Sequence, residues 1–177
     1  GDVIRTQDFT WNLNANVSYN KNKLVELYNG VQEYVNSTTG LKYVVGHPVH
    51  EYFLNRYAGV NPANGDALWY TKDGELTTEF KDKVMTGKTF DSPWAGGFGT
   101  TFSWKGLSLS AQFSWMADRW VMNNDRFFEE SNGLYSAYNQ SKRLLYDRWK
   151  KPGDITDIPR YGVVAQLDDR FLENTSF

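Results

Sequence analysis

The feature that most constrains the fold is the strict alternation of apolar and polar residues on both sides of Lys105-Gly106. Residues 96–104 place aromatic side chains at even positions, and residues 107–117 place apolar side chains at odd positions. Alternation with a period of two is typical of a β-strand with two different faces. If Lys105-Gly106 is a two-residue hairpin loop, apolar residues pair with apolar ones, so the turn and the pattern select the same register. The apolar set is Phe98, Phe102, Trp104, Leu107, Leu109, Ala111, Phe113 and Trp115.

A third strand is predicted over residues 9–19, where the alternation is the most regular in the chain. Apolar residues occupy the odd positions from Phe9 to Tyr19, and Thr, Asn or Ser occupies every even position. The apolar row ends in an aromatic residue on both sides. This suits a transmembrane barrel strand, whose apolar band is flanked by aromatic girdles, although a strand of a soluble β-sandwich could end in the same way.

Charged residues are absent from all three predicted strands, at about 9–19, 96–104 and 107–117. The outer face of a soluble sandwich usually carries Lys and Glu, partly to keep sheet edges from pairing with other molecules. Charge on the lipid side of a transmembrane strand costs roughly 2–4 kcal/mol, so such strands keep their charges in loops. The pattern therefore favours a mainly β fold in which residues 1–177 form antiparallel strands of a partial transmembrane β-barrel. The alternative is a soluble β-sandwich that binds carbohydrate.

Two long loops are expected, at residues 20–93 and 118–170. The first reads as mostly irregular, with short strands at 42–45 and 67–71, and it is rich in aromatic residues, which argues against disorder. The second is expected to carry a short helix at about 134–149. Apolar residues at helical spacing indicate this helix, namely Leu134, Tyr138, Leu145 and Trp149.

Composition excludes several kinds of partner and site. The net charge is −2 and no basic run occurs, so nucleic acid is not an expected partner. The chain has no cysteine, which removes disulfides, thiolate metal sites and cysteine nucleophiles. No apolar run approaches the length of a membrane-spanning helix. The first residues show no signal-peptide pattern.

Several short stretches of the chain are recognisable in combination. They are Val17–Lys23, Gly59–Asp66, Trp94–Ala117, Asp118–Trp120, Trp149–Asp154, Ile158–Arg160 and Phe171–Phe177. Together, and in this order across nearly the whole chain, they resemble the C-terminal portion of SusC/RagA-like TonB-dependent outer-membrane transporters.

The resemblance implies a fold, a location and partners. Such transporters are large barrels of about 22 strands with an N-terminal plug. They sit in outer-membrane lipid and import oligosaccharides or peptides with energy from TonB, under the lid of a SusD-like surface lipoprotein. The regions matching the plug and the TonB box are absent here, so the resemblance implies a fragment that contacts TonB only through its parent. At about 10 residues per strand, the chain supplies three or four strands of the wall. If Lys105-Gly106 is a periplasmic turn, both long loops are extracellular.

Aromatic residues in the two loops are the candidate substrate contacts. Stacking on sugar rings or on peptide side chains would use exposed aromatic faces. The alternative is that these residues pack the loops against each other or against the lid protein. The candidates are Trp69, Tyr70, Trp120 and Tyr135, whereas Trp149 fits the buried stripe of the expected helix better.

No metal, cofactor or catalytic site is expected. His47 and His50 are separated by Pro48 and have no second pair of ligands near them. The residues Asn61, Asn64, Asp66 and Asp73 do not match the EF-hand spacing and read better as a turn with Asx hydrogen bonds.

The adjacent acids Glu129-Glu130 and Asp168-Asp169 do not indicate an enzyme either. Glycoside hydrolysis needs two carboxyl groups a fixed distance apart on opposite sides of a bond, which neighbouring residues rarely provide. The chain also lacks a Gly-x-Ser-x-Gly nucleophile motif. A solvated acidic surface is the simpler interpretation, and no enzymatic activity is expected.

Overall fold

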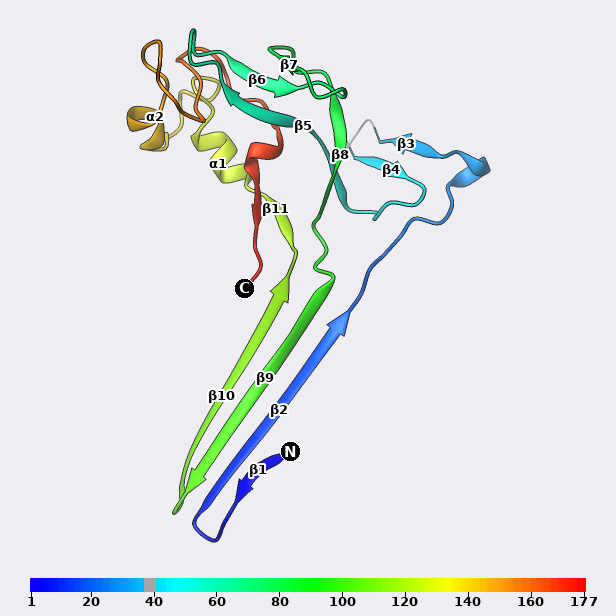
Figure 1. The fold of residues 1–177 in the computed structure, drawn as a ribbon, viewed down its shortest axis with the longest axis vertical. Helices are drawn as coiled ribbons and strands as arrows, with labels where there is room; N and C mark the ends of the chain where they lie inside the picture. Colours follow the sequence, from blue (N-terminus) through cyan, green and yellow to red (C-terminus); the bar gives the residue numbers. More distant parts are fainter. Residues whose placement is uncertain (37–40) are drawn as a thin grey trace.

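A long four-stranded sheet and a lobe at one end of it make up the fold (Figure 1). The computed structural model describes residues 1–36 and 41–177. The fold is mainly β, every pair of named strands is antiparallel, and helices are few and short. In Figure 1 the sheet forms the lower half and the lobe the upper half, and both long loops leave the sheet at its upper end.

The long sheet contains β1 (Asp2–Arg5), β2 (Phe9–Tyr19), β9 (Trp94–Trp104) and β10 (Leu107–Ala117) in the order β1-β2-β9-β10. Across the β9–β10 hairpin, Trp104 pairs with Leu107 and Phe98 with Phe113, which is the register that the alternation predicts. Lys105 and Gly106 both have positive φ, at 45° and 88°, as the tight turns of two-residue hairpins require. The strand β9 begins two residues earlier than expected, at Trp94.

The lobe contains the remaining elements. A small hairpin pairs β3 (Glu33–Val35) with β4 (Lys42–Val44). A second four-stranded sheet has the order β7-β6-β5-β8, and β11 pairs with β12 below two short helices. The bounds are β5 (Glu51–Val60), β6 (Ala67–Tyr70), β7 (Leu76–Thr77), β8 (Lys83–Thr89), β11 (Trp120–Met122), β12 (Leu172–Asn174), α1 (Asn124–Glu129) and α2 (Arg143–Tyr146), with 3-10 turns at Tyr28–Gly30 and Asp169–Phe171.

The first loop is more ordered than its sequence indicates. Residues 42–44 and 67–70 are strands, close to the two predicted short strands, but β5 and β8 also lie in the segment read as mostly irregular. Buried polar side chains mask the sequence pattern of β5, because Glu51 and Asn55 are only 3% and 1% exposed within the lobe. A strand that buries polar residues among apolar ones shows no clean alternation.

The prediction of a helix at residues 134–149 is wrong. Only Arg143–Tyr146 is helical in that range, and Leu134, Tyr138 and Leu145 are exposed rather than aligned on a buried face. Turns replace the helix, and the Gln140 amide donates hydrogen bonds to main-chain oxygens of residues 135 and 138. The neighbouring helix α1 is capped by Asn123, whose side-chain oxygen accepts a hydrogen bond from the Arg126 main-chain N–H at 2.8 Å.

The hydrophobic core lies entirely in the lobe. Within the described residues, the buried apolar side chains are Leu54, Ala67, Trp69, Leu144, Ile158, Ala165, Phe171 and Leu172. None of them belongs to the long sheet, where Val17 and Leu109 are 64% and 68% exposed. No helix in the described ranges is long and apolar enough to cross a membrane.

The long sheet leaves no room for a side chain at Gly96 in β9. A Cβ atom on Gly96 would overlap the main-chain oxygen of Asn16 and lie 2.8 Å from the Trp115 ring. The three atoms nearest to a Cβ on Gly99 all belong to the flexible end of the Gln112 side chain. We therefore expect Gly96→Ala to destabilise the full-length protein by about 1–3 kcal/mol and Gly99→Ala to have a much smaller effect. Denaturant unfolding of both variants checks this, and equal stabilities would contradict it.

Candidate functional site: a two-faced sheet and its lobe

The long sheet has one apolar face. Residues directly opposite in an antiparallel register share a face, so odd positions of β2 and β10 and even positions of β9 lie together. Within this apolar face Thr100 carries the one polar side chain, and its hydroxyl accepts a hydrogen bond from the Trp11 indole N–H at 2.9 Å. This bond matters in hydrocarbon, where an unsatisfied polar group costs several kcal/mol.

The apolar face has the height of a bilayer core. Each of its three long strands has 11 residues, which span about 34 Å along the strand. At the tilt of about 40° that is usual in barrels, this length rises about 26 Å, close to the apolar band of about 25 Å. Aromatic residues mark both ends, with Phe9 opposite Trp104 at the lower end and Tyr19 opposite Trp94 at the upper end. These rows match interfacial girdles.

The opposite face is polar and carries no charge on the three long strands, whereas the short edge strand β1 adds Asp2 and Arg5, which form an ion pair of 3.5 Å with each other. Its side chains come from even positions of β2 and β10 and odd positions of β9, and they are mostly Asn, Ser, Thr and Gln. Cross-strand hydroxyl pairs form between Thr101 and Ser110 at 3.1 Å and between Ser103 and Ser108 at 2.9 Å. This face is suited to water or to another polar surface.

Both outer edges of the sheet are largely free among the described residues. The strand β1 covers only the lower part of β2, and no named strand pairs with the outer edge of β10. At the upper end, the last residue returns to β10, where the main chains of Phe177 and Met116 exchange two hydrogen bonds of 2.9 and 3.0 Å. Long free edges with an exposed apolar face are typical of a sheet that pairs with further strands.

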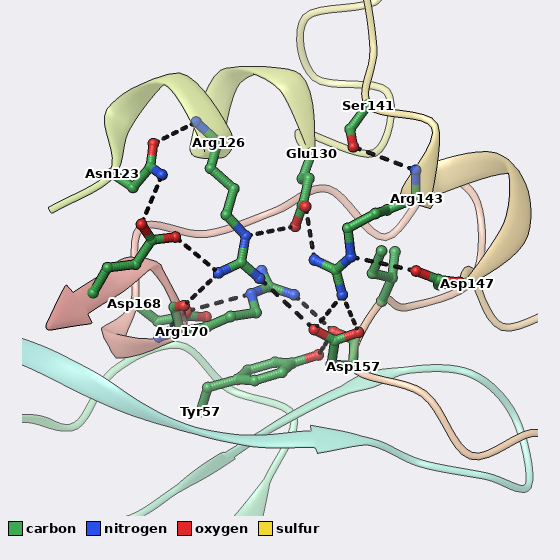
Figure 2. Close-up of polar contacts among 12 residues, drawn as sticks. Tyr57, Asn123, Arg126, Glu130, Ser141, Arg143, Asp147, Asp157, Asp168 and Arg170 are labelled. Carbon is green, nitrogen blue, oxygen red and sulfur yellow. Dashed lines mark hydrogen bonds and ion pairs between the residues drawn. The ribbon is translucent and has the colours of Figure 1, made fainter. Parts of the chain in front are cut away.

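A cluster of three arginines holds the lobe together (Figure 2). This arginine cluster comprises Arg126, Arg143 and Arg170 with the carboxylates of Glu130, Asp157 and Asp168. The buried carboxylate of Glu130 forms ion pairs with the guanidinium groups of both Arg126, at 3.2 Å, and Arg143, at 2.7 Å. Arg143 also donates two hydrogen bonds of 2.8 Å to Asp157, so the cluster joins α1, α2 and the segment before β12.

Burial and charge set the ionisation of this cluster. Partial burial would raise the pKa of Asp157, but the hydrogen bonds and charge of Arg143 hold it below the ordinary value. At Asp168 burial dominates and raises the carboxyl pKa, against the opposing charge of Arg170. Burial likewise raises the pKa of the Tyr57 hydroxyl, which donates to the main-chain oxygen of Asp157 at 2.9 Å. The cluster is structural, because its charged groups pair mainly with one another and with main-chain oxygens of the lobe.

The structure separates the four candidate substrate contacts. Trp69 is 5% exposed and donates its indole N–H to Asp168 at 2.8 Å, so it presents no face to a ligand. Tyr70 lies under the Arg56 guanidinium, 5.5 Å from the ring centre, and Trp120 lies under the Lys88 ammonium at 4.2 Å. Tyr135 belongs to an aromatic group with Phe127, Phe128 and Tyr138. The four residues do not form one site.

The other singled-out side chains have local partners. Trp149 donates to the main-chain oxygen of Pro62 at 3.1 Å and packs on the turn at Gly65, rather than on a helix stripe. His47 pairs with Glu51 at 2.8 Å, and His50 pairs with Asp91 at 2.9 Å. The two histidines therefore do not converge, and no group of metal ligands forms within the described ranges.

The turn at residues 61–66 has the Asx hydrogen bonds that its sequence indicates. The Asn61 side-chain oxygen accepts from the Ala63 N–H at 3.0 Å, and that of Asn64 accepts from the Asp66 N–H at 3.1 Å. Sequence reasoning missed the arginine cluster, whose members lie far apart along the chain. It also missed Phe128, whose ring packs on Tyr135. The available signal was the pair Asp125 and Glu129, whose i, i+4 spacing indicates an acidic helix face beside Phe128.

The chain is similar to known proteins in both sequence and fold, although no protein-family model matches it. Over 208 residues it is 22% identical to TonB-dependent receptor P39 of Formosa agariphila, covering 90% of this chain and 20% of that protein. The structure of the RagAB peptide transporter matches 99% of this chain with 31% identity and a TM-score of 0.90. The chain spans about one fifth of the length of these relatives.

Two further structures show the RagAB peptide importer in different states. The open-open state matches with a TM-score of 0.90 and the closed-closed state with 0.89, each at 32% identity and over 99% of this chain and 20% of that chain. The relatives are named as receptors, transporters and importers, not as enzymes. This chain thus matches the two states about equally well.

Proposed function

We propose that this chain, which belongs to the SusC/RagA-like TonB-dependent transporters of the outer membrane, supplies part of the barrel wall and an extracellular lobe of a nutrient importer. The observation that carries the proposal is the sheet whose three long strands are uncharged and have one apolar and one polar face. In the intact barrel, the apolar face contacts lipid and the polar face lines the interior around the plug. The free edges of β2 and β10 pair with neighbouring wall strands.

A soluble β-sandwich that binds carbohydrate fits the fold less well. A sandwich would cover the apolar face with a second sheet and form a core between the two. Here the buried apolar residues lie in the lobe, while Leu13, Phe98 and Phe113 of the apolar face are at least two-fifths exposed. The sheet is a single layer in the described structure (Figure 1).

The lengths of the connections support the sidedness of the wall. Short turns at residues 6–8 and 105–106 join strands at the lower end, whereas residues 20–93 connect two strands at the upper end and residues 118–177 leave and return there (Figure 1). Transmembrane barrels have short periplasmic turns and longer extracellular loops. The lobe therefore faces outward, where cargo and a SusD-like surface lipoprotein would meet it, and TonB would act through the plug.

The lobe would serve as a rigid platform. The arginine cluster ties its helices and strands together through ion pairs. This observation supports a lobe that keeps its shape while the lid moves. Cargo of either class, oligosaccharide or peptide, would then bind to a preformed surface.

Removal of the second loop tests this assignment. In a full-length transporter that carries these residues, we expect deletion of residues 118–170 to allow insertion into the outer membrane but to abolish uptake and lid association. Fluorescent-cargo uptake and co-purification of the lid measure the two losses. Replacing Lys105-Gly106 by Asn-Gly, a favoured hairpin pair at the opposite end, is the control and should leave uptake unchanged. Normal uptake by the deletion variant would contradict the assigned role.

A further inference from the structure

An open pocket on the outer side of α1 is lined by aromatic and acidic side chains. We call it the aromatic pocket; it has a volume of about 590 Å³ and is lined by Asp125, Phe128, Glu129, Tyr135, Tyr138 and Asn139. The ring centres of Phe128 and Tyr135 lie 4.8 Å apart, and those of Tyr135 and Tyr138 lie 6.4 Å apart. The rings are inclined by 58° and 64°, so they enclose a concave space rather than presenting one flat surface.

The walls of the aromatic pocket are held from behind. Phe127 packs edge-on against Phe171, which is fully buried, and contacts both Phe128 and Tyr135. The Ser131 hydroxyl accepts a hydrogen bond from the Tyr135 main-chain N–H at 3.2 Å. These contacts hold the rings of Phe128 and Tyr135 in place before a ligand arrives, which lowers the entropic cost of binding.

The two carboxylates of the pocket are not neutralised. Helical spacing places Asp125 and Glu129 on the outer side of α1, and neither side chain has an ion pair or hydrogen bond with the part of the chain that the structure describes. Arg126 and Glu130 point inward and pair with each other within the arginine cluster. Two like charges at i and i+4 repel each other, so a cation bound between them removes an existing cost.

We propose that the aromatic pocket binds a lysine or arginine side chain of a peptide cargo. An alkylammonium or guanidinium group is attracted to aromatic ring faces, most strongly where several rings form a cage. The carboxylates add charge complementarity that a neutral sugar would not use. This proposal rests on the proposed import function and deepens it, because it selects a peptide with a basic residue from the two cargo classes.

Peptides that differ in one side chain test the proposal in the full-length transporter. The probes are two fluorescent peptides of identical sequence, apart from one lysine in the first that is glutamine in the second. We expect the double variant Asp125→Asn, Glu129→Gln to bind the lysine peptide about tenfold more weakly and to bind the glutamine peptide with unchanged affinity. Glu75→Gln, which neutralises an exposed lobe carboxylate outside the pocket, is the matched control and should change neither affinity.

Three results with the variants would overturn the proposal. The first is equal weakening of both peptides, which would indicate a structural role for the carboxylates. The second is no weakening of either peptide. The third is loss of association with the lid lipoprotein at unchanged peptide affinity, which would assign the pocket to the lid. If the wild-type transporter neither binds nor imports any peptide or glycan, the proposed function fails, whereas unselective peptide binding by the wild type overturns the basic-residue preference alone.

Discussion

Replacing Phe113 by arginine is expected to destabilise the full-length transporter by about 2–4 kcal/mol in a bilayer, because the charge would enter the lipid side of the wall. Phe113 lies on the apolar face near mid-strand and stacks on Phe98 with ring centres 4.6 Å apart. Loss of this stacking adds about 0.5–1.5 kcal/mol. Urea unfolding in liposomes measures the change in the free energy of unfolding.

Ser114→Arg is the matched control for this experiment. Ser114 follows Phe113 directly, lies at nearly the same height and is exposed on the polar face opposite Gly97. An arginine there would extend into the barrel interior, so we expect a change of well under half that of Phe113→Arg. Equal destabilisation by the two variants would show that the two faces do not meet different environments.

Replacing Asp168 by alanine is expected to destabilise the lobe by about 3–5 kcal/mol, because it leaves the buried Arg170 guanidinium without this partner. The Asp168 side chain is completely buried and accepts hydrogen bonds from the Trp69 indole at 2.8 Å and the Arg170 main-chain N–H at 3.1 Å. The guanidinium of Arg170 lies 3.7 Å from its carboxylate. Trp69 fluorescence and limited proteolysis measure unfolding of the lobe. Heat-modifiable gel migration measures whether the barrel is still folded, so the comparison shows whether the loss of stability is confined to the lobe.

Asp168→Asn separates hydrogen bonding from charge. Burial raises the pKa of Asp168, which means that the lobe disfavours the ionised carboxyl despite the nearby Arg170. An asparagine keeps an oxygen that can accept from Trp69, so we expect it to cost clearly less than alanine. If the asparagine and alanine variants lose the same stability, the charge rather than the hydrogen bonds stabilises this region.

The long sheet was predictable because its pattern is local. The alternation in residues 107–117 and the turn at Lys105-Gly106 determine the register together, since a slip by one residue would exchange the two faces. Both faces of this sheet are open in the structure, so no tertiary contact overrides the pattern. The resemblance to a transporter family likewise follows from short stretches that can be read in order.

The lobe was not predictable to the same extent, because contacts distant in the sequence decide its structure. Glu51 lies in β5 because His47 and the Gly87 main-chain N–H satisfy its buried carboxylate, and no periodicity signals this. The spacing of Leu134, Tyr138 and Leu145 predicts a helix, yet turns stabilised by Gln140 replace it. Trp69 reads as an exposed ligand contact but is buried, and its indole N–H donates to Asp168, 99 residues later in the chain.

The most direct test of the account follows the alternation across β10 in a membrane. The chain has no cysteine, so single cysteines at positions 107–117 of a full-length transporter without other cysteines can each carry a spin label. In liposomes, we predict that lipid-soluble oxygen relaxes labels at odd positions most strongly, and that a water-soluble nickel complex relaxes labels at even positions. Equal access of the nickel complex to Leu109 and Ser110, or to Phe113 and Ser114, would contradict a wall with one face in lipid.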